Sequence, residues 1–212
     1  SHSISKLIGS PPGYVGYDEG GRLTEAVRRN PYSIVLFDEI EKAHKDIFNV
    51  LLQILDDGRV TDSRGKVVDF KNTIIIMTSN IGSEILLDKT PEAEVIIEKM
   101  LSNYFRPEFL NRIDDVVIFS PLDKDVQYKI VDKLLNELRV RLQRQNLHIN
   151  FSENVKNYVL DEAFDEKFGA RRLKRFISKR VETFIARSIL GDDIETGRDY
   201  IVDVYSNKLV IK

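Results

Sequence analysis

Residues 33–42 read Ser-Ile-Val-Leu-Phe-Asp-Glu-Ile-Glu-Lys, so four apolar residues run directly into the acidic pair Asp38 and Glu39. An apolar run of this length, with β-branched and aromatic members, predicts a strand buried on both faces of a parallel sheet. Ligands bind at the carboxyl ends of such strands. One carboxylate there can hold a hydrated Mg²⁺ while its neighbour polarises an attacking water, as nucleotide hydrolysis requires. From these residues alone, a strand ending in a solvated acidic turn is an equally good interpretation.

The first part of the chain alternates strand-like apolar runs with helical patterns, which is typical of an α/β fold. Apolar spacing and turn residues predict strands at 73–79 and 116–119, helices at 46–56 and 92–104, and a hairpin around Gly65 at 60–70. Gly58 follows the first of these helices at the position of a C-cap. The second apolar run, 73–79, has the character of a buried strand and is expected to neighbour the first.

The pattern changes after residue 121, where we expect a boundary between an α/β subdomain at 1–121 and a small α+β subdomain at 122–212. A long amphipathic helix is predicted at 123–145, with one apolar face made by Val126, Ile130, Leu134, Leu138 and Leu142. The remaining elements predicted are strands at 147–151, 200–205 and 208–211, a helix that opens at Ser152, and a helix at 170–190.

Composition excludes several classes of function. The 32 basic and 34 acidic residues nearly cancel, which argues against a general nucleic-acid or membrane-surface partner. The chain has no cysteine, so disulfides, thiolate metal sites and cysteine nucleophiles are excluded. No apolar stretch reaches membrane-spanning length and no signal-peptide pattern is present, so the expectation is a cytoplasmic protein.

A phosphate-binding loop is missing from these 212 residues. No Gly-x-x-x-x-Gly-Lys-Ser/Thr motif occurs, and the nearest match, Gly65-Lys66, is followed by Val67 inside the expected hairpin. The chain therefore carries residues suited to Mg²⁺ and water, but none that would cradle the phosphates. Either the protein is not a nucleotide hydrolase, or the N-terminal part of its domain lies outside this chain.

Five segments decide between these interpretations: SKLIGSPPGYVGYDEGGRLTEAV, SIVLFDEIEK, TIIIMTSN, FRPEFLNRID and FGARRLKR. Read in this order, the chain resembles the second nucleotide-binding module of the Clp family of AAA+ unfoldases over essentially its whole length. The resemblance implies a partial AAA+ large subdomain, a parallel sheet with flanking helices, that starts after the phosphate loop. A small mixed C-terminal subdomain follows, and the cofactors implied are ATP and Mg²⁺.

The resemblance also implies roles for individual residues. Asp38 and Glu39 match the Mg²⁺-assisting acid and the catalytic base, and Asn80 matches the sensor 1 position. Arg112 matches the arginine finger, which can serve a neighbouring subunit, and Arg171 matches sensor 2. From the residues alone, Asn80 would be interpreted as a turn cap and Arg112 as half of a surface ion pair. Arg171 would be interpreted as part of a solvated basic helix face. Arg106 is a weaker match to the finger, and Arg172 stands where Pro is frequent in the family.

The tetrapeptide Gly13-Tyr14-Val15-Gly16 looks like the pore loop that grips polypeptide in this family. Glycines give the backbone freedom, and an aromatic ring offers broad, sequence-tolerant contact. The alternative is an ordinary loop in which Tyr14 packs on its own domain. The hairpin at 61–66 is a candidate for a second axial loop.

The subtype follows from a segment that is short here. Clp members that feed a peptidase usually carry an exposed Ile/Leu/Val-Gly-Phe/Leu tripeptide after sensor 1, and 81–104 contains none. The resemblance therefore favours a ClpB-type disaggregase: a homo-hexamer that threads aggregated polypeptides with ATP, with possible help from co-chaperones. The alternatives are a ClpA- or ClpC-type unfoldase that feeds a ClpP-like peptidase and, less favoured, an AAA+ nucleic-acid remodeller. The isolated chain is expected to be inactive as an ATPase.

Overall fold

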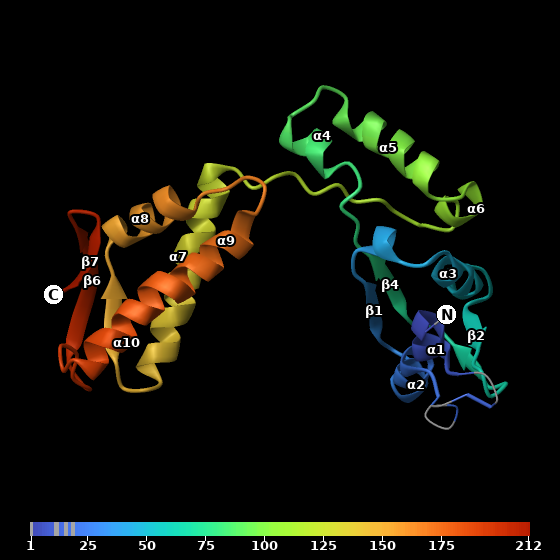
Figure 1. Ribbon diagram of the computed structural model, residues 1–212, viewed down its shortest axis with the longest axis horizontal. Helices are drawn as coiled ribbons and strands as arrows, with labels where there is room; N and C mark the ends of the chain where they lie inside the picture. Colours follow the sequence, from blue (N-terminus) through green and yellow to red (C-terminus); the bar gives the residue numbers. More distant parts are fainter. Residues whose placement is uncertain (1, 11–12, 15–16, 18–19) are drawn as a thin grey trace. The chain divides into compact units, whose positions relative to one another are not determined.

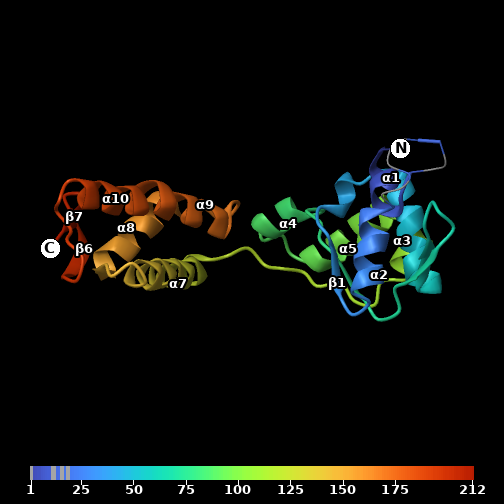
Figure 2. The same ribbon diagram turned by 90° about the horizontal axis from the view of Figure 1, so that it is seen from below.

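The computed structural model describes residues 2–10, 13–14, 17 and 20–212. The chain forms two compact units, Ser1–Ile118 and Phe119–Lys212. Figures 1 and 2 show the first in blue to yellow-green and the second in yellow to red. Among the described residues, no helix has both the length and the apolar composition that a bilayer span requires.

The first unit is built around two parallel strands, β1 (Ile34–Phe37) and β4 (Ile74–Met77), which pair in register from Ile34 with Ile74 to Phe37 with Met77. The other elements are α1 (His2–Ile8), α2 (Arg22–Arg29), η2 (Ile40–Lys42), α3 (Lys45–Asp57), α4 (Ser83–Leu87), α5 (Ala93–Tyr104) and α6 (Pro107–Leu110), with the antiparallel hairpin of β2 (Arg59–Thr61) and β3 (Val67–Asp69). This is the expected parallel sheet with flanking helices, and that prediction is confirmed.

Helix α3 shows how local sequence sets the element boundaries. Its apolar residues at helical spacing are buried in the core of the unit, and Leu51 is wholly inaccessible. The helix ends where predicted, because Gly58 adopts a left-handed conformation (φ 63°) and its N–H donates to the Ile54 carbonyl at 3.0 Å. The chain then turns directly into the predicted hairpin.

The prediction that both faces of the strands are buried is wrong. Val35, Phe37, Ile75 and Met77 pack against the core of the unit. The alternate side chains face solvent, and large fractions remain exposed at Ile34 (66%), Leu36 (58%), Ile74 (61%) and Ile76 (43%). The described residues supply cover for one face of this pair only. An apolar run shows that a strand can be buried, but not how many of its faces are covered.

The strand predicted at 116–119 is also absent from the structure, where this stretch has no regular secondary structure. Val117 and Phe119 are 67% and 84% exposed. β-branched and aromatic residues favour strands only where a partner strand offers hydrogen bonds and packing.

The second unit places helices against a three-stranded sheet. Strand β6 (Asp199–Tyr205) lies in the centre, parallel to β5 (His148–Phe151) and antiparallel to β7 (Lys208–Ile211). The helices are α7 (Lys124–Gln143), α8 (Glu153–Ala163), α9 (Gly169–Phe176) and α10 (Thr183–Leu190), with the π-helical η3 (Ile177–Glu182) joining the last two. The small mixed subdomain is therefore confirmed.

The buried face of α7 differs from the prediction. Residues spaced strictly by four drift about 40° around an α-helix at every step, so such a series leaves the core. Val126 is accordingly 38% exposed. The buried side chains of the helix are Gln127, Val131, Leu135, Leu138 and Leu142. The Gln127 amide is held inside because it donates to the carbonyls of Leu122 (2.9 Å) and Asp165 (3.0 Å).

The π-helical turn η3 compensates for the same rotation of side chains away from the core in the continuous helical stretch of α9, η3 and α10. Leu173, Ile177, Val181 and Ile185 are spaced by four, yet all four are at most 3% exposed. In an uninterrupted α-helix the three steps would rotate the last side chain about 120° away from the first. A π turn contains about one residue more than an α-helical turn, so the side chains that follow it face the core again.

Candidate functional site

The acidic pair lies where the two parallel strands end. Beyond the last residues of β1 and β4, the pairing continues as the Thr78 N–H donates to the Phe37 carbonyl and the Ile40 N–H donates to the Thr78 carbonyl, both at 2.9 Å. Asp38 is exposed and Glu39 is half-buried. Glu39 takes a left-handed backbone conformation (φ 55°, ψ 54°). For a residue with a Cβ, this costs about 1–2 kcal/mol, a strain that is characteristic of functional sites.

Thr78 organises the pair. Its hydroxyl donates to Asp38 Oδ1 at 2.5 Å and accepts the Glu39 backbone N–H at 3.0 Å. One side chain thus aims the first carboxylate and holds the strained backbone of the second. Thr78 was not among the residues predicted for the site. A signal was available, because a hydroxyl two positions before Asn80 emerges at the same edge of a parallel sheet.

Asn80 joins the acidic pair from the neighbouring strand. Its side-chain Nδ2 lies 3.5 Å from Glu39 Oε1, and its backbone N–H donates to Glu41 Oε1 at 3.4 Å. The Glu41 carbonyl accepts a hydrogen bond from the Tyr104 hydroxyl, which ties this loop to α5. The structure therefore brings Asp38, Glu39 and Asn80 together at one edge of the sheet.

Lys42 is a second residue in contact with the acidic pair that was not predicted from the sequence. Its Nζ lies 2.9 Å from Glu39 Oε2, and the hydrogen bond raises the pKa of Lys42. The spacing of three residues between the two is the usual distance for a pair within a helical turn. Glu39 therefore has one oxygen directed to Lys42 and the other to Asn80.

The donor set at this edge suits Mg²⁺ held through a substrate. Mg²⁺ in nucleotide sites is usually held by one or two carboxylates, by waters and by the phosphates themselves. Asp38 offers an exposed carboxylate of this kind. Among the described residues, no group of three or more His, Cys, Asp or Glu side chains could hold a metal unaided. The residues thus fit a phosphate-bridged ion rather than a metal caged by protein.

Arg112 is positioned by an aromatic cluster at a different part of the unit. Phe105 and Phe109 pack with Phe48 of α3 at ring-centroid distances of 5.6 and 5.3 Å. This anchor holds the short α6, and Arg112 follows it with its Nε paired to Asp56 in the last turn of α3. Helix α3 begins a few residues after the acidic pair, and its axis extends about 18 Å from there to the turn that contains Asp56. Arg112 therefore does not join the cluster formed by Glu39 and Asn80.

Arg171 lies in the second unit, in the first turn of α9, and is exposed. The start of this helix is fixed by Asp165, whose carboxylate accepts the backbone N–H groups of Phe168 (2.9 Å) and Lys167 (2.8 Å) and pairs with Arg172 at 2.6 Å. The hydrogen bond from the Phe168 N–H is the largest cause of the lowered pKa of Asp165. Arg172, found where the family often has Pro, thus sits within a regular helical turn.

Of the expected pore loop, the structure describes Gly13 and Tyr14, while Val15 and Gly16 lie outside the described residues. The Tyr14 side chain is 71% exposed. Its carbonyl accepts the Tyr17 N–H at 3.3 Å. The alternative in which Tyr14 packs into its own domain does not match this exposure.

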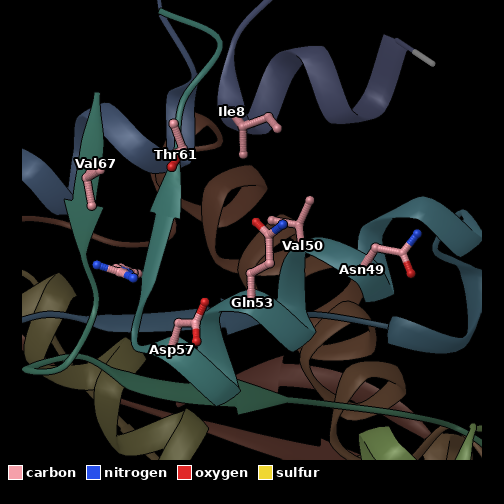
Figure 3. Close-up of a pocket in the computed structure, with 8 residues that line it drawn as sticks. Ile8, Asn49, Val50, Gln53, Asp57, Thr61 and Val67 are labelled. Carbon is pink, nitrogen blue, oxygen red and sulfur yellow. The ribbon is translucent and has the colours of Figure 1, made fainter. Parts of the chain in front are cut away.

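A hollow of about 490 Å³ lies elsewhere on the first unit, between the end of α1, helix α3 and the β2–β3 hairpin. Figure 3 shows Ile8 and Thr61 pointing toward Val50 and Gln53 across it. None of the residues predicted for the site lines this hollow. It marks the place where α1 and the hairpin approach each other.

Comparison with known families matches both units. Residues 1–116 match the profile of the AAA domain (Cdc48 subfamily). The chain belongs to this AAA family. Residues 122–202 match the C-terminal, D2-small domain of ClpB protein. The resemblance to the Clp family, inferred from five short segments, and to its ClpB type, inferred from the segment 81–104, is thus confirmed.

Individual relatives of this AAA chain agree. It is 54% identical to the chaperone protein ClpB of Staphylococcus epidermidis and 52% identical to that of Bacillus anthracis, over 98% and 99% of its own length. It spans about a quarter of the length of these relatives (25%). Among solved structures, it is similar to chains of a Saccharomyces cerevisiae Hsp104–casein complex in an extended conformation and of a closed state of Hsp104 with ATPγS and labelled casein. The TM-scores are 0.87 and 0.88 at 38% identity, covering 99% of this chain and 38% and 37% of those chains.

Proposed function

We propose that this chain is part of an ATP-driven disaggregase, a hexameric chaperone that threads unfolded or aggregated polypeptides through an axial pore. The observation that carries the proposal is the cluster of Asp38, Glu39, Thr78 and Asn80 at the adjacent carboxyl ends of β1 and β4. The likeness to ClpB chaperones over nearly the whole chain supports it. The same proposal includes ATP and Mg²⁺ as cofactors, a cytoplasmic location and cooperation with co-chaperones.

Within this proposal, each residue at the strand ends has a separate task. Asp38, aimed by Thr78, would hold Mg²⁺ through water, and the ion when bound supplies positive charge at the phosphates. Glu39 accepts a proton from the attacking water at a carboxylate oxygen. Asn80, beside Glu39 Oε1, orients that water by hydrogen bonding.

Two arginines are proposed to complete the reaction from outside this cluster. Arg112 lies at the far end of α3 from the acidic pair, which favours action on the nucleotide of a neighbouring subunit. Arg171 is proposed as the contact through which the small subdomain responds to nucleotide. We place the subdomain boundary at 121/122, between the two stretches that the family profiles match.

Tyr14, flanked by Gly13, Val15 and Gly16, is proposed as the polypeptide-gripping residue. A side chain that is 71% exposed is available for contact with a passing chain. The solved Hsp104 structures to which this chain is similar contain casein, which is consistent with a polypeptide substrate.

The segment after Asn80 favours a disaggregase over an unfoldase that feeds a peptidase. Gly82 is buried, and a Cβ built on it would lie 2.6 Å from Ile97 Cγ1 of α5. The Ile81-Gly82-Ser83 tripeptide is therefore packed against its own unit and does not form an exposed docking loop. The near-neutral charge of the chain speaks against the third alternative, a nucleic-acid remodeller.

The test uses the longer protein that contains this chain. We expect Glu39→Gln to retain ATP binding and to stop hydrolysis. Tyr14→Ala should keep much of the ATPase activity and lose threading of labelled casein. Normal disaggregation by Tyr14→Ala would contradict the role of the loop. Stable ATP-dependent capture of a ClpP-type peptidase would overturn the choice of disaggregase.

A further inference from the structure

Gly9 and Gly21, which precede and follow Tyr14 in the sequence, lie close together in the structure. A Cβ built on Gly9 would lie 3.2 Å from the Gly21 backbone nitrogen, and one built on Gly21 would overlap the Leu7 carbonyl. No side chain fits at either position, so the two ends of the segment that carries Tyr14 lie in backbone contact. We call Gly9, Gly20 and Gly21 the neck of the segment.

The neck rests on the turn of the β2–β3 hairpin. The Ser63 N–H donates to the Ile8 carbonyl at 2.9 Å, and a Cβ on Gly9 would overlap the Ser63 hydroxyl. On the other side of the neck, a Cβ on Gly20 would lie 2.5 Å from Arg64 Nη2. Two consecutive residues of the hairpin therefore contact the two ends of the Tyr14 segment, one each.

Arg64 is held by contacts with both the hairpin turn and α2. Asp62, with its side chain 2% exposed, accepts the backbone N–H groups of Arg64 (2.9 Å) and Lys66 (2.8 Å), which fixes the turn. The Arg64 guanidinium lies 3.5 Å from Asp62 Oδ2 through Nε and pairs through Nη2 with Glu25 of α2. Its side chain is 22% exposed, far less than that of a free surface arginine.

Glu25 provides an internal comparison, because Arg28 and Arg64 both hydrogen-bond to it, while Arg29 Nε lies farther away, 4.0 Å from Glu25 Oε2. Arg28 pairs with Glu25 Oε2 at 2.7 Å from the solvent side, with its own side chain 51% exposed, and Arg64 pairs with Oε1. The hydrogen bond from Arg28 is the largest cause, and that from Arg64 a further one, that lowers the pKa of Glu25 to about 2. Of these two arginines, it is Arg64 that also contacts Gly20 of the neck.

We propose that Arg64 is a positioning residue for the polypeptide-gripping segment, which it braces between the hairpin turn and α2. The brace holds the neck against the hairpin, and it thereby fixes the two points of the fold between which the Tyr14 segment is attached. The role of Arg64 in substrate handling rests on the proposed function of Tyr14. The brace itself does not.

Hydrogen exchange of the 212-residue chain tests the brace directly, with Arg28→Ala as the matched control. Arg64→Ala should speed exchange roughly tenfold at the Gly9 and Ser63 amides, as expected for loss of one hydrogen bond to a charged group. Arg28→Ala, which removes a partner of the same carboxylate, should leave both unchanged, and Arg64→Lys should give an intermediate rate. Equal exchange in Arg64→Ala and Arg28→Ala would overturn the proposal, as would a change confined to the hairpin.

Titration of the longer protein with labelled casein then separates positioning from general stability. Arg64→Ala should weaken the apparent affinity for casein several-fold with a smaller effect on the maximal rate, and Arg64→Lys should recover part of the affinity. A fall in the maximal rate alone would overturn the positioning role. If Tyr14→Ala leaves casein affinity unchanged, the proposed function of the loop fails, while the exchange result still decides the brace.

Discussion

The Thr78 hydroxyl donates to Asp38 Oδ1 at 2.5 Å, across the ends of two paired parallel strands. The Thr78 hydroxyl oxygen also accepts the backbone N–H of Glu39, which follows Asp38 in the chain, at 3.0 Å. A single hydroxyl thereby connects the proposed metal-holding acid to the strained backbone of the proposed base.

Replacement of Thr78 tests this connection. Thr78→Val keeps the shape of the side chain and loses both hydrogen bonds, so the first unit should lose about 1 kcal/mol of unfolding free energy. In the longer protein, the rate of ATP hydrolysis should fall more than the affinity for ATP, because the carboxylates are no longer aimed. Thr78→Ser retains the hydroxyl and serves as the control. Equal kinetics for the two variants would refute the assignment.

The position of Arg112 leads to a prediction about mixed hexamers. Arg112→Ala and Glu39→Gln should each abolish hydrolysis, by roughly a thousandfold or more for the arginine. If Arg112 serves the neighbouring subunit, a Glu39→Gln subunit still offers its arginine to the intact base of an Arg112→Ala subunit. Mixing the two inactive proteins should therefore restore part of the activity. Mixtures that stay inactive despite co-assembly would show that the arginine acts within its own subunit.

The 212-residue chain by itself should show no ATP turnover. It contains no Gly-x-x-x-x-Gly-Lys-Ser/Thr motif, so backbone N–H groups and a lysine to hold the β- and γ-phosphates are not supplied. A phosphate-release assay on the purified chain gives the measurement. Turnover that disappears in Glu39→Gln would contradict this expectation, whereas turnover that persists in that variant would identify a contaminating enzyme.

The strand ends could be predicted from the sequence because their signals are local. An apolar run followed by Asp38 and Glu39, and a second run followed by Asn80, place three polar side chains at one edge of any parallel sheet. The end of α3 could also be predicted, because Gly58 readily adopts the left-handed conformation that ends a helix. In each case, the residues that decide the structure are close together in the chain.

What could not be predicted depends on residues far apart in the sequence. The place of Thr78 at this edge follows from its spacing to Asn80, but its hydrogen bond to Asp38, forty positions away, does not. Ile34 and Ile74 read as buried, yet their exposure depends on what covers the sheet. The brace is of the same kind, since Arg64 and Glu25 are 39 residues apart.

Acid should weaken the second unit through Asp203. Its carboxylate is bound by Lys212 (2.6 Å), the largest cause of its lowered pKa, and by Ser152 (2.6 Å), Asn154 (2.9 Å) and the Val204 N–H (2.8 Å). A carboxyl whose pKa is lower in the folded state stabilises above its unfolded pKa of about 3.9, and this stability is lost as the pH falls further.

Urea titrations of the second unit at several pH values provide the measurement. Asp203→Asn should be less stable than the parent near pH 7, and the difference should shrink as the pH falls below about 4. Asp199→Asn, which alters a carboxylate 90% exposed on the same strand, is the control and should leave the curve almost unchanged. A gap between Asp203→Asn and the parent that stays constant down to acid pH would show that Asp203 acts by packing rather than by charge.

The π turn in the last long helix has a consequence for how this unit can change length. A single-residue deletion in an α-helix normally rotates everything beyond it by about 100°. Within η3, one residue is surplus to an ordinary helical turn, so its removal can be absorbed by conversion of the π turn to α-helix. The apolar residues of α10 would then keep their orientation. The exposed positions Ser178 to Arg180 are thus where this helix should best tolerate the loss of a residue, whereas a deletion within α9 or α10 should unfold it.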